Sequence, residues 1–151
     1  MPAPARFVVL GTSFGGRVAL ELALAAPGRV MGLVVIGAGP GPAVDPDAGR
    51  RRSQRLRGGE FEQVVAEMAA MISHLSGPNG PAAREAFIAR ARDQGADLMA
   101  CQSDALAKRA DLWPRMAEIG CPALMLWGAQ DQFSPTADGL RLSSSVAHGR
   151  Y

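Results

Sequence analysis

A serine between two glycines stands near the start of the sequence, in the stretch Gly11-Thr12-Ser13-Phe14-Gly15. Two kinds of chemistry use a glycine-rich corner of this type. A serine held at the tip of a tight turn between a strand and a helix can act as a nucleophile. Glycines at such a corner can instead bring the backbone close to the phosphates of a dinucleotide. The residues around the corner distinguish the two hypotheses.

The dinucleotide hypothesis lacks several of its requirements. Gly11 and Gly15 supply the first two glycines of a phosphate-binding pattern, but Arg17 stands where the third is needed. The second expected strand ends at Ile36 with no acid to bind a ribose. The only tyrosine is Tyr151, so a Tyr-x-x-x-Lys catalytic pair cannot occur, and no Gly-Lys-Ser/Thr loop is present. A dinucleotide-binding oxidoreductase therefore stays a remote alternative.

The nucleophile hypothesis fits the pattern better. The motif G-x-S-x-G between an expected strand and an expected helix resembles the nucleophile elbow of the α/β-hydrolases. Strand and helix cross closely there, so we expect that a side chain at Gly11 or Gly15 would clash. The resemblance implies that Ser13 is the nucleophile. It also implies that the backbone N–H of Phe14, at the start of the helix, donates to the oxyanion.

A second motif, residues 121–135 with the sequence CPALMLWGAQDQFSP, resembles a later strand of the same family. The family pattern is P-x-L-x-x-x-G-x-x-D-x-x-x-P, and the resemblance implies that Asp131 is the triad acid. The order Ser13 then Asp131 is the family's order. Because parallel strands end at one edge of a sheet, we expect both residues at that edge. The alternative for Asp131 is an N-cap of the next helix.

A serine nucleophile needs a base, which in this family is a histidine after the last strand. The sequence has two histidines, and neither stands at that position. His148 precedes any further strand, so we expect it at the opposite edge of the sheet, roughly 17–20 Å from Ser13. His74 ends an expected helix and is a candidate to line the pocket, with helix capping as the alternative. The base is thus absent from its expected position.

The elements that would carry these residues begin and end the chain. Residues 7–10 form an apolar run typical of a strand buried on both faces, and residues 33–36 and 123–127 form similar runs. Helical patterns follow the first and the last run, at residues 17–26 and about 135–144. Strand, helix and strand with short turns predict a parallel sheet.

The middle of the chain, from residue 45 to about 108, shows helical patterns and no strand alternation. An apolar stripe recurs there at helical spacing, at Phe61, Val64, Val65, Met68 and Ile72. The expected fold is therefore α/β: a partial parallel-sheet α/β-hydrolase core of about three to four strands. We expect one domain over residues 1–151, with core elements at 1–41 and 110–151 and a helical cap-like insertion at 42–109.

Composition limits the classes of partner. A net charge of +2 gives no reason to expect nucleic acid, and no apolar run reaches the ~18 residues that span a bilayer. The basic cluster at residues 50–57 is interpreted as a solvated helix face. Cys101 and Cys121 are isolated, as expected for free thiols in a reducing cytoplasm and not for a metal site. Residues 1–6 show no signal-peptide layout, which also favours the cytoplasm.

The resemblance implies a serine hydrolase that acts on a small acyl substrate, an ester, lactone or thioester, through an acyl-enzyme. It implies no metal and no organic cofactor. The family has further strands and a second oxyanion donor before the elbow, so we expect a truncated C-terminal part of the core that is inactive alone. The alternative is a non-catalytic fragment that folds on a partner carrying the missing strands. In either case the first strand would expose an edge through which chains self-associate.

Overall fold

The computed structural model describes residues 5–151 and divides the chain into two compact units. The sheet unit combines the residues up to Gly41 with Asp111–Tyr151, and the helical unit is Pro42–Ala110. Residues 1–4, part of the expected domain and of the N-terminal layout, lie outside the described residues. Among the described residues, every helix is too short or too polar to span a membrane.

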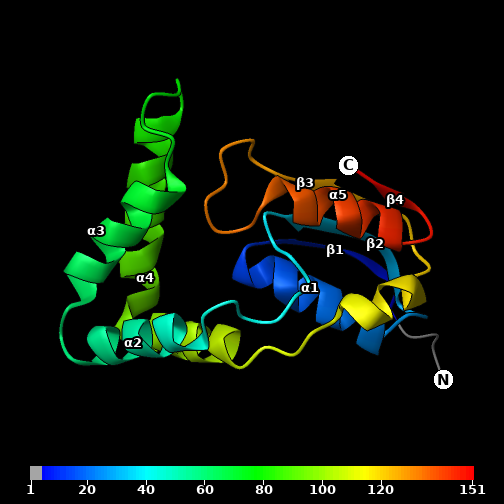
Figure 1. Cartoon of the computed structure of the whole chain (residues 1–151), viewed down its shortest axis with the longest axis horizontal. Coiled ribbons are helices and arrows are strands. Elements are labelled where there is room, and N and C mark those ends of the chain that lie inside the picture. Colours follow the sequence, from blue (N-terminus) through cyan, green and yellow to red (C-terminus); the bar gives the residue numbers. More distant parts are fainter. Residues whose placement is uncertain (1–4) are drawn as a thin grey trace. The chain divides into compact units, whose positions relative to one another are not determined.

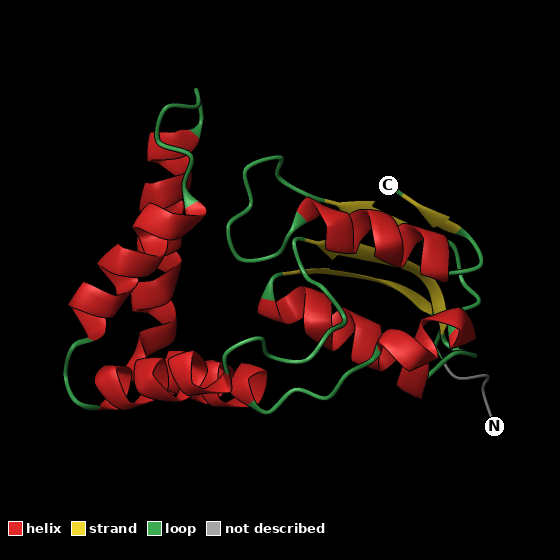
Figure 2. Ribbon diagram, in the orientation of Figure 1, coloured by secondary structure: helices red, strands yellow, loops and turns green. Residues whose placement is uncertain are grey.

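The sheet unit alternates strands and helices, as Figures 1 and 2 show. Its strands are β1 (Phe7–Thr12), β2 (Val30–Ile36), β3 (Ala123–Leu126) and β4 (Gly149–Arg150). Its helices are α1 (Phe14–Ala25), the 3-10 helix η1 (Trp113–Glu118) and α5 (Thr136–Ser145). The strands lie in the order β1-β2-β3-β4 and every neighbouring pair is parallel. The expected α/β class and partial parallel sheet are confirmed.

One face of this sheet carries the core. Leu20 of α1, Met116 of η1 and Leu142 of α5 are each 0% exposed. They belong to one cluster with the same strand residues, Val30, Leu33, Val35, Ala123 and Met125. The helices therefore share a face. The topology explains this, because each crossover steps to the next strand in the same direction, and right-handed crossovers of that kind place every helix on one side.

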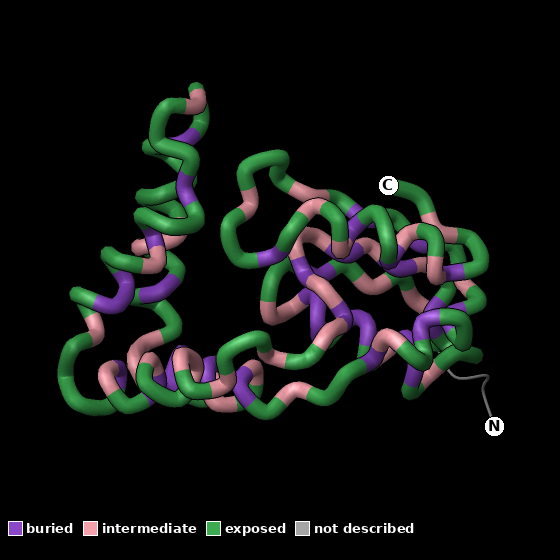
Figure 3. Tube along the Cα trace, viewed as in Figure 1, coloured by how far each residue is buried: buried purple, intermediate pink, exposed green. Residues whose placement is uncertain are grey.

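The opposite face of the sheet is exposed, so the burial expected from the sequence is wrong there. Residues 7–10 were expected to form a strand buried on both faces, yet Val8 is 66% and Leu10 is 64% exposed. The two residues alternate with Phe7 and Val9, which pack against the core cluster. Figure 3 shows buried segments in purple among exposed segments in green in the sheet unit. The apolar run indicates a strand that is suited to burial on both faces. The helices of the sheet unit, however, cover one face only.

The helical unit consists of α2 (Pro46–Arg57), α3 (Phe61–Ile72) and α4 (Gly80–Ala107). Gly95, with φ +78°, interrupts α4. The helices enclose a core of their own: Leu56, Val64, Val65, Ala91, Met99 and Ala100. The expected stripe on α3 is correct except at Ile72, which is 42% exposed at the C-terminal end of the helix.

Candidate active site

Ser13 stands in the turn between β1 and α1. Its φ of 51° and ψ of −118° make it the one residue other than glycine with positive φ among residues 5–151. Such a conformation is strained and persists where the surroundings fix it. Here the Ser13 N–H donates to the Ile36 carbonyl (2.9 Å), and the Ser13 carbonyl accepts from the Arg17 N–H (3.1 Å). The turn is held on both sides while the side chain stays exposed.

Two glycines allow β1 and α1 to approach this closely. A Cβ at Gly11 would lie 2.1 Å from the carbonyl oxygen of Gly15, which no neighbour can relieve because the contact is with backbone. A Cβ at Gly16 would lie 2.6 Å from the Cβ of Ala38. A Cβ at Gly15, in contrast, would meet nothing within 4 Å. The expected clash is therefore correct at Gly11 and wrong at Gly15, because the carbonyl of Gly15 and not its Cα hydrogen faces the strand.

The amide of Phe14 begins α1, directly after Ser13. N–H groups in the first turn of a helix have no acceptor within the helix. The macrodipole adds partial positive charge at the same end. An anion that forms at the Ser13 side chain would therefore meet a donor and a favourable field.

Asp131 lies in the loop that connects β3 to α5. Its Oδ1 accepts hydrogen bonds from the N–H groups of Phe133 and Ser134, both at 2.9 Å. The indole Nε1 of Trp127 donates to the Ser134 carbonyl across the same loop (3.0 Å). The N-cap of α5 is Pro135. Asp131 thus holds the loop and does not cap the helix, so the capping alternative is wrong.

The carboxylate of Asp131 reaches the end of β2. A Cβ at Gly37, the residue that follows β2, would lie 2.9 Å from Asp131 Oδ2, and Gly37 itself has φ +56°. The Gly37 N–H donates to the Leu126 carbonyl at the end of β3 (2.9 Å). Ser13, Gly37 and Asp131 therefore follow the carboxyl ends of three adjacent strands. Within residues 5–151, neither Ser13 Oγ nor Asp131 Oδ2 has a hydrogen-bond partner.

The histidines lie elsewhere. The His148 carbonyl accepts from the Ala123 N–H (3.1 Å), and Gly149 pairs with Ala123 at the start of β3. His148 is therefore at the amino edge of the sheet, opposite the edge that carries Ser13. His74 is exposed and follows α3 in the helical unit, where it lines an open hollow of about 230 Å³.

The structural role of Arg17 was not predicted from the sequence. It is 5% exposed, and its Nη1 donates to the carbonyls of Pro40 (2.6 Å) and Gly41 (3.2 Å). Its Nη2 pairs with Glu21 at 3.1 Å. Arg17 thereby ties the loop after β2 to the helix that presents Ser13. The signal was present, because Arg17 lies on the helix face of Gly16 and Leu20 and has an acid four residues on.

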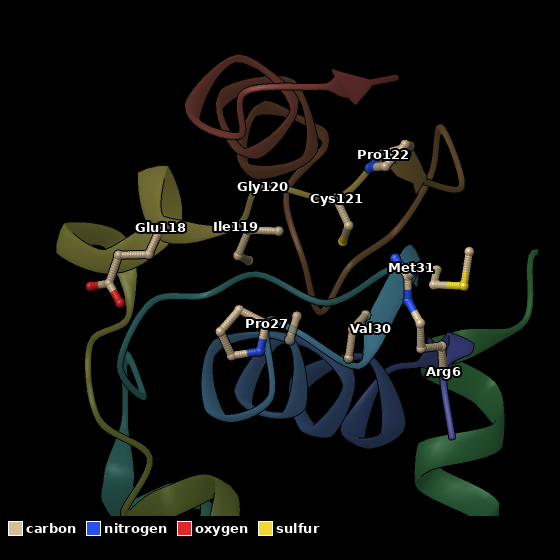
Figure 4. Close-up of a pocket in the computed structure, with 10 residues that line it drawn as sticks. Arg6, Pro27, Val30, Met31, Glu118, Ile119, Gly120, Cys121 and Pro122 are labelled. Atoms are coloured by element: carbon tan, nitrogen blue, oxygen red, sulfur yellow. The ribbon is translucent and has the colours of Figure 1, made fainter. Parts of the chain in front are cut away.

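A cavity of the sheet unit lies away from the elbow. It measures about 400 Å³, and Figure 4 shows Val30, Cys121 and Pro122 among the lining residues. These residues begin β2 or precede β3, which puts the cavity at the amino edge. Burial raises the pKa of the Cys121 thiol, so it is not activated as a nucleophile. No group of three or more possible metal ligands occurs in the described part of the chain.

A family model described as the alpha/beta hydrolase fold matches residues 4–147. The chain belongs to the α/β-hydrolase family. This membership favours the nucleophile hypothesis over the dinucleotide hypothesis, since it is the family in which the elbow motif was expected.

Individual relatives agree with this family. The chain is 31% identical over 149 residues to the 2-hydroxy-6-oxononadienedioate/2-hydroxy-6-oxononatrienedioate hydrolase of Paraburkholderia xenovorans, covering 93% of this chain and 51% of that protein. A thermophilic esterase from Thermogutta terrifontis superposes with a TM-score of 0.87 at 22% identity, over 97% of this chain and 55% of its own. The enol-lactonase from Burkholderia xenovorans gives 0.82 at 22% identity, over 97% and 56%. This chain spans about half the length of the curated relatives it matches.

Proposed function

We propose that this chain contributes the nucleophile, one oxyanion donor and the acid of a serine hydrolase site. The observation that carries the proposal is the backbone of Ser13, which is strained, hydrogen-bonded on both sides and exposed at its side chain. Strain of this kind is characteristic of functional sites. The elbow places Ser13 beside the N-terminus of α1, and Asp131 follows a strand that ends at the same edge.

In the proposed reaction, Ser13 Oγ attacks the carbonyl carbon of an acyl substrate and gives its proton to a base. The new Oγ–C bond turns the carbonyl oxygen into an oxyanion, to which the Phe14 N–H donates. The oxyanion then collapses, the leaving group departs with the proton, and an acyl-enzyme remains. Water hydrolyses this ester by the same steps and restores Ser13.

The position of Asp131 suits a base placed between it and Ser13. Their strands are two inter-strand spacings apart, roughly 10 Å. An imidazole ring with a hydrogen bond of about 2.8 Å at each end fills a gap of that order. Asp131 Oδ2 is free to accept from one ring nitrogen while the other takes the Ser13 proton. His148 lies at the wrong edge, so we expect the base to come from a histidine outside this sequence.

The substrate class follows from the chemistry and from the relatives. The solved structures with this fold include an esterase and an enol-lactonase, both named for the cleavage of acyl–oxygen bonds. We propose a small ester, lactone or thioester as substrate. The dienedioate that appears in the name of the Paraburkholderia relative is the second substrate class to assay. The proposed steps use no metal and no organic cofactor, and we expect the protein in the cytoplasm.

Chemical rescue tests this proposal on the chain itself. A fluorophosphonate probe is incubated with the chain in the presence of free imidazole, which replaces the absent base, and the labelled residue is located by mass spectrometry. We expect labelling at Ser13 that rises with imidazole concentration, and with pH as imidazolium loses its proton, because only neutral imidazole can accept the serine proton. Ser13→Ala should abolish the labelling. Asp131→Asn should weaken the increase in labelling that imidazole produces at Ser13.

Ser134→Ala is the matched control, since Ser134 is buried and its backbone N–H and carbonyl make the hydrogen bonds to Asp131 and Trp127. It should label like the unsubstituted chain. Absence of imidazole-dependent labelling at Ser13 at any pH would refute the nucleophile. The non-catalytic alternative, which the exposed face of the sheet favours, would then be adopted.

A further inference from the structure

The exposed face of the sheet carries aliphatic side chains in register across three strands. Leu10 pairs with Val34, and Val34 pairs with Leu124, which forms one row. Thr12, Ile36 and Leu126 form the next row, and Val8 lies beside Gly32 on the amino side of both. We call the aliphatic members of these rows the bare face: Val8, Leu10, Val34, Ile36, Leu124 and Leu126.

The bare face is unlike a surface adapted to water. Val8 and Leu10 are 66% and 64% exposed, and Leu124 and Leu126 are 38% and 43% exposed. Sheets with one solvated face place polar residues on that face, whereas parallel sheets with both faces covered are aliphatic throughout. Contiguous apolar patches on soluble proteins mark interaction sites. The composition of the bare face therefore predicts that another layer covers it.

The edge of β1 adjoins the bare face. β1 stands first in the strand order and pairs with β2 alone, so its outer N–H and C=O groups have no ladder partner among residues 5–151. An unpaired edge of six residues is a template for another strand. A small ligand or a lipid could cover aliphatic side chains but could not continue the ladder. The occupant is therefore a polypeptide that brings both a strand and an apolar helix.

We propose that the bare face and the β1 edge form one docking surface for the α/β-hydrolase segment that has no counterpart in this sequence, and that this segment docks when it is supplied as a separate chain. The Thermogutta esterase match uses 97% of this chain but 55% of the esterase, at a TM-score of 0.87. Because almost all of this chain is already superposed, the cover has to correspond to the unmatched part of such a protein. The inference rests on the fold and the bare face, and not on the chemistry of Ser13.

A second copy of this chain fits the docking surface less well than the proposed segment does. Two copies could stack their bare faces, but both β1 edges would stay unpaired. Pairing the two β1 edges instead would extend the sheet and leave both bare faces exposed. The helices of the sheet unit cannot serve as the cover, because their apolar sides are buried on their own sheet, as Leu20 and Leu142 at 0% exposure show.

The test uses three probes, each the part of a relative that precedes its nucleophile elbow, made as a separate tagged polypeptide. They come from the Paraburkholderia hydrolase, the Thermogutta esterase and the Burkholderia enol-lactonase. Each segment is co-expressed with this chain, captured by its tag, and analysed by size-exclusion chromatography with light scattering. We expect at least one segment to give a 1:1 complex. The complex should protect the β1 amides from hydrogen exchange.

Two variants place a charge on the surface, Leu10→Lys and Leu126→Lys. Both residues are exposed in the chain alone, so the variants should fold as the unsubstituted chain does by circular dichroism. Burying an unpaired lysine opposes docking, so we expect capture to fall roughly tenfold or more. Val18→Lys and Leu140→Lys are matched controls on α1 and α5, at residues 47% and 52% exposed, and should leave capture unchanged.

Three outcomes would overturn the proposal. They are failure of all three segments to bind, capture that the bare-face variants do not reduce, and a complex of two copies of this chain in place of the 1:1 complex. Ser13→Ala separates this test from the catalytic proposal. It should bind the segments normally even though it cannot be labelled, so docking and nucleophile can fail independently.

Discussion

The two units bury their apolar residues in different ways. In the helical unit, α2, α3 and α4 enclose a shared core, and the outer sides carry ion pairs such as Arg55 with Glu67 and Arg92 with Glu62. In the sheet unit, the helices cover one face while Leu10 and Leu126 on the other stay exposed. One unit closes around its own core and the other is half closed. A closed core is the condition for independent stability, so we expect the helical unit to be the more self-sufficient of the two.

The difference in stability between the two units can be measured, because fluorescence and circular dichroism report on them differently. Both tryptophans, Trp113 and Trp127, belong to the sheet unit. Their fluorescence reports that unit alone, whereas far-ultraviolet circular dichroism is dominated by helices. Two transitions that do not coincide would support a difference between the units, and a single coincident transition would contradict it.

The largest effect is expected from Gly11→Ala. The new methyl carbon would lie 2.1 Å from the Gly15 carbonyl oxygen, so β1 and α1 must separate and the Ser13 turn must open. We expect a loss of more than about 3 kcal/mol from the sheet unit. Tryptophan fluorescence during urea unfolding measures it, and the helical unit should keep its circular dichroism.

Gly15→Ala adds the same methyl group four residues on, where nothing lies within 4 Å. It should leave the unfolding midpoint unchanged or raise it slightly, since alanine favours a helix over glycine. Equal damage from the two substitutions would show that the strand–helix crossing at Gly11 is looser than the structure indicates.

A matched pair of core truncations gives the next effect. Leu20→Ala in the sheet unit and Leu56→Ala in the helical unit each remove a side chain that is 0% or 1% exposed. Each should cost about 2–5 kcal/mol. We expect Leu20→Ala to move the fluorescence transition and Leu56→Ala to move the circular dichroism transition. If either variant shifts both probes equally, the units unfold together and the comparison fails.

The sequence predicted those features that local chemistry determines. The Ser13 elbow follows from Gly11, from the apolar run before it and from the helix formers after it, and the βα rhythm predicted the parallel sheet. The bare face did not follow, because an aliphatic strand such as β1 shows that it is suited to burial but not what covers it. Gly15 shows the same limit, since a motif marks a close crossing without showing which Cα hydrogen points into it.

Arg17→Met is expected to have an intermediate effect on the sheet unit. It removes the donors to the Pro40 and Gly41 carbonyls while keeping an unbranched side chain of similar length. The Pro40 carbonyl keeps its hydrogen bond from the Leu112 N–H (2.9 Å), so the cost is that of losing hydrogen bonds from a charged donor, about 1.5–3 kcal/mol. Fluorescence-monitored unfolding and faster hydrogen exchange in the loop after β2 measure the change. Val18→Met, at the exposed neighbour, should change neither, and an Arg17→Met chain as stable as the original would refute the proposed tie.

The smallest effect concerns the ion pairs that distinguish the helical unit. The hydrogen bond from Arg55 holds the pKa of Glu67 below its usual 4.5, so the folded state binds this proton less readily than the unfolded state. The stabilisation is therefore present above pH 4.5 and is lost as the pH falls through the lowered pKa.

Glu67→Gln should lower the circular dichroism midpoint slightly at pH 7, and the difference from the unsubstituted chain should vanish in acid and shrink in high salt. Glu85→Gln on α4, at an exposed residue, is the control and should leave the circular dichroism midpoint at pH 7 unchanged. A Glu67→Gln difference that persists below pH 3 would mean that packing and not charge joins α3 to α2, and the outer ion pairs would then no longer explain the closure of this unit.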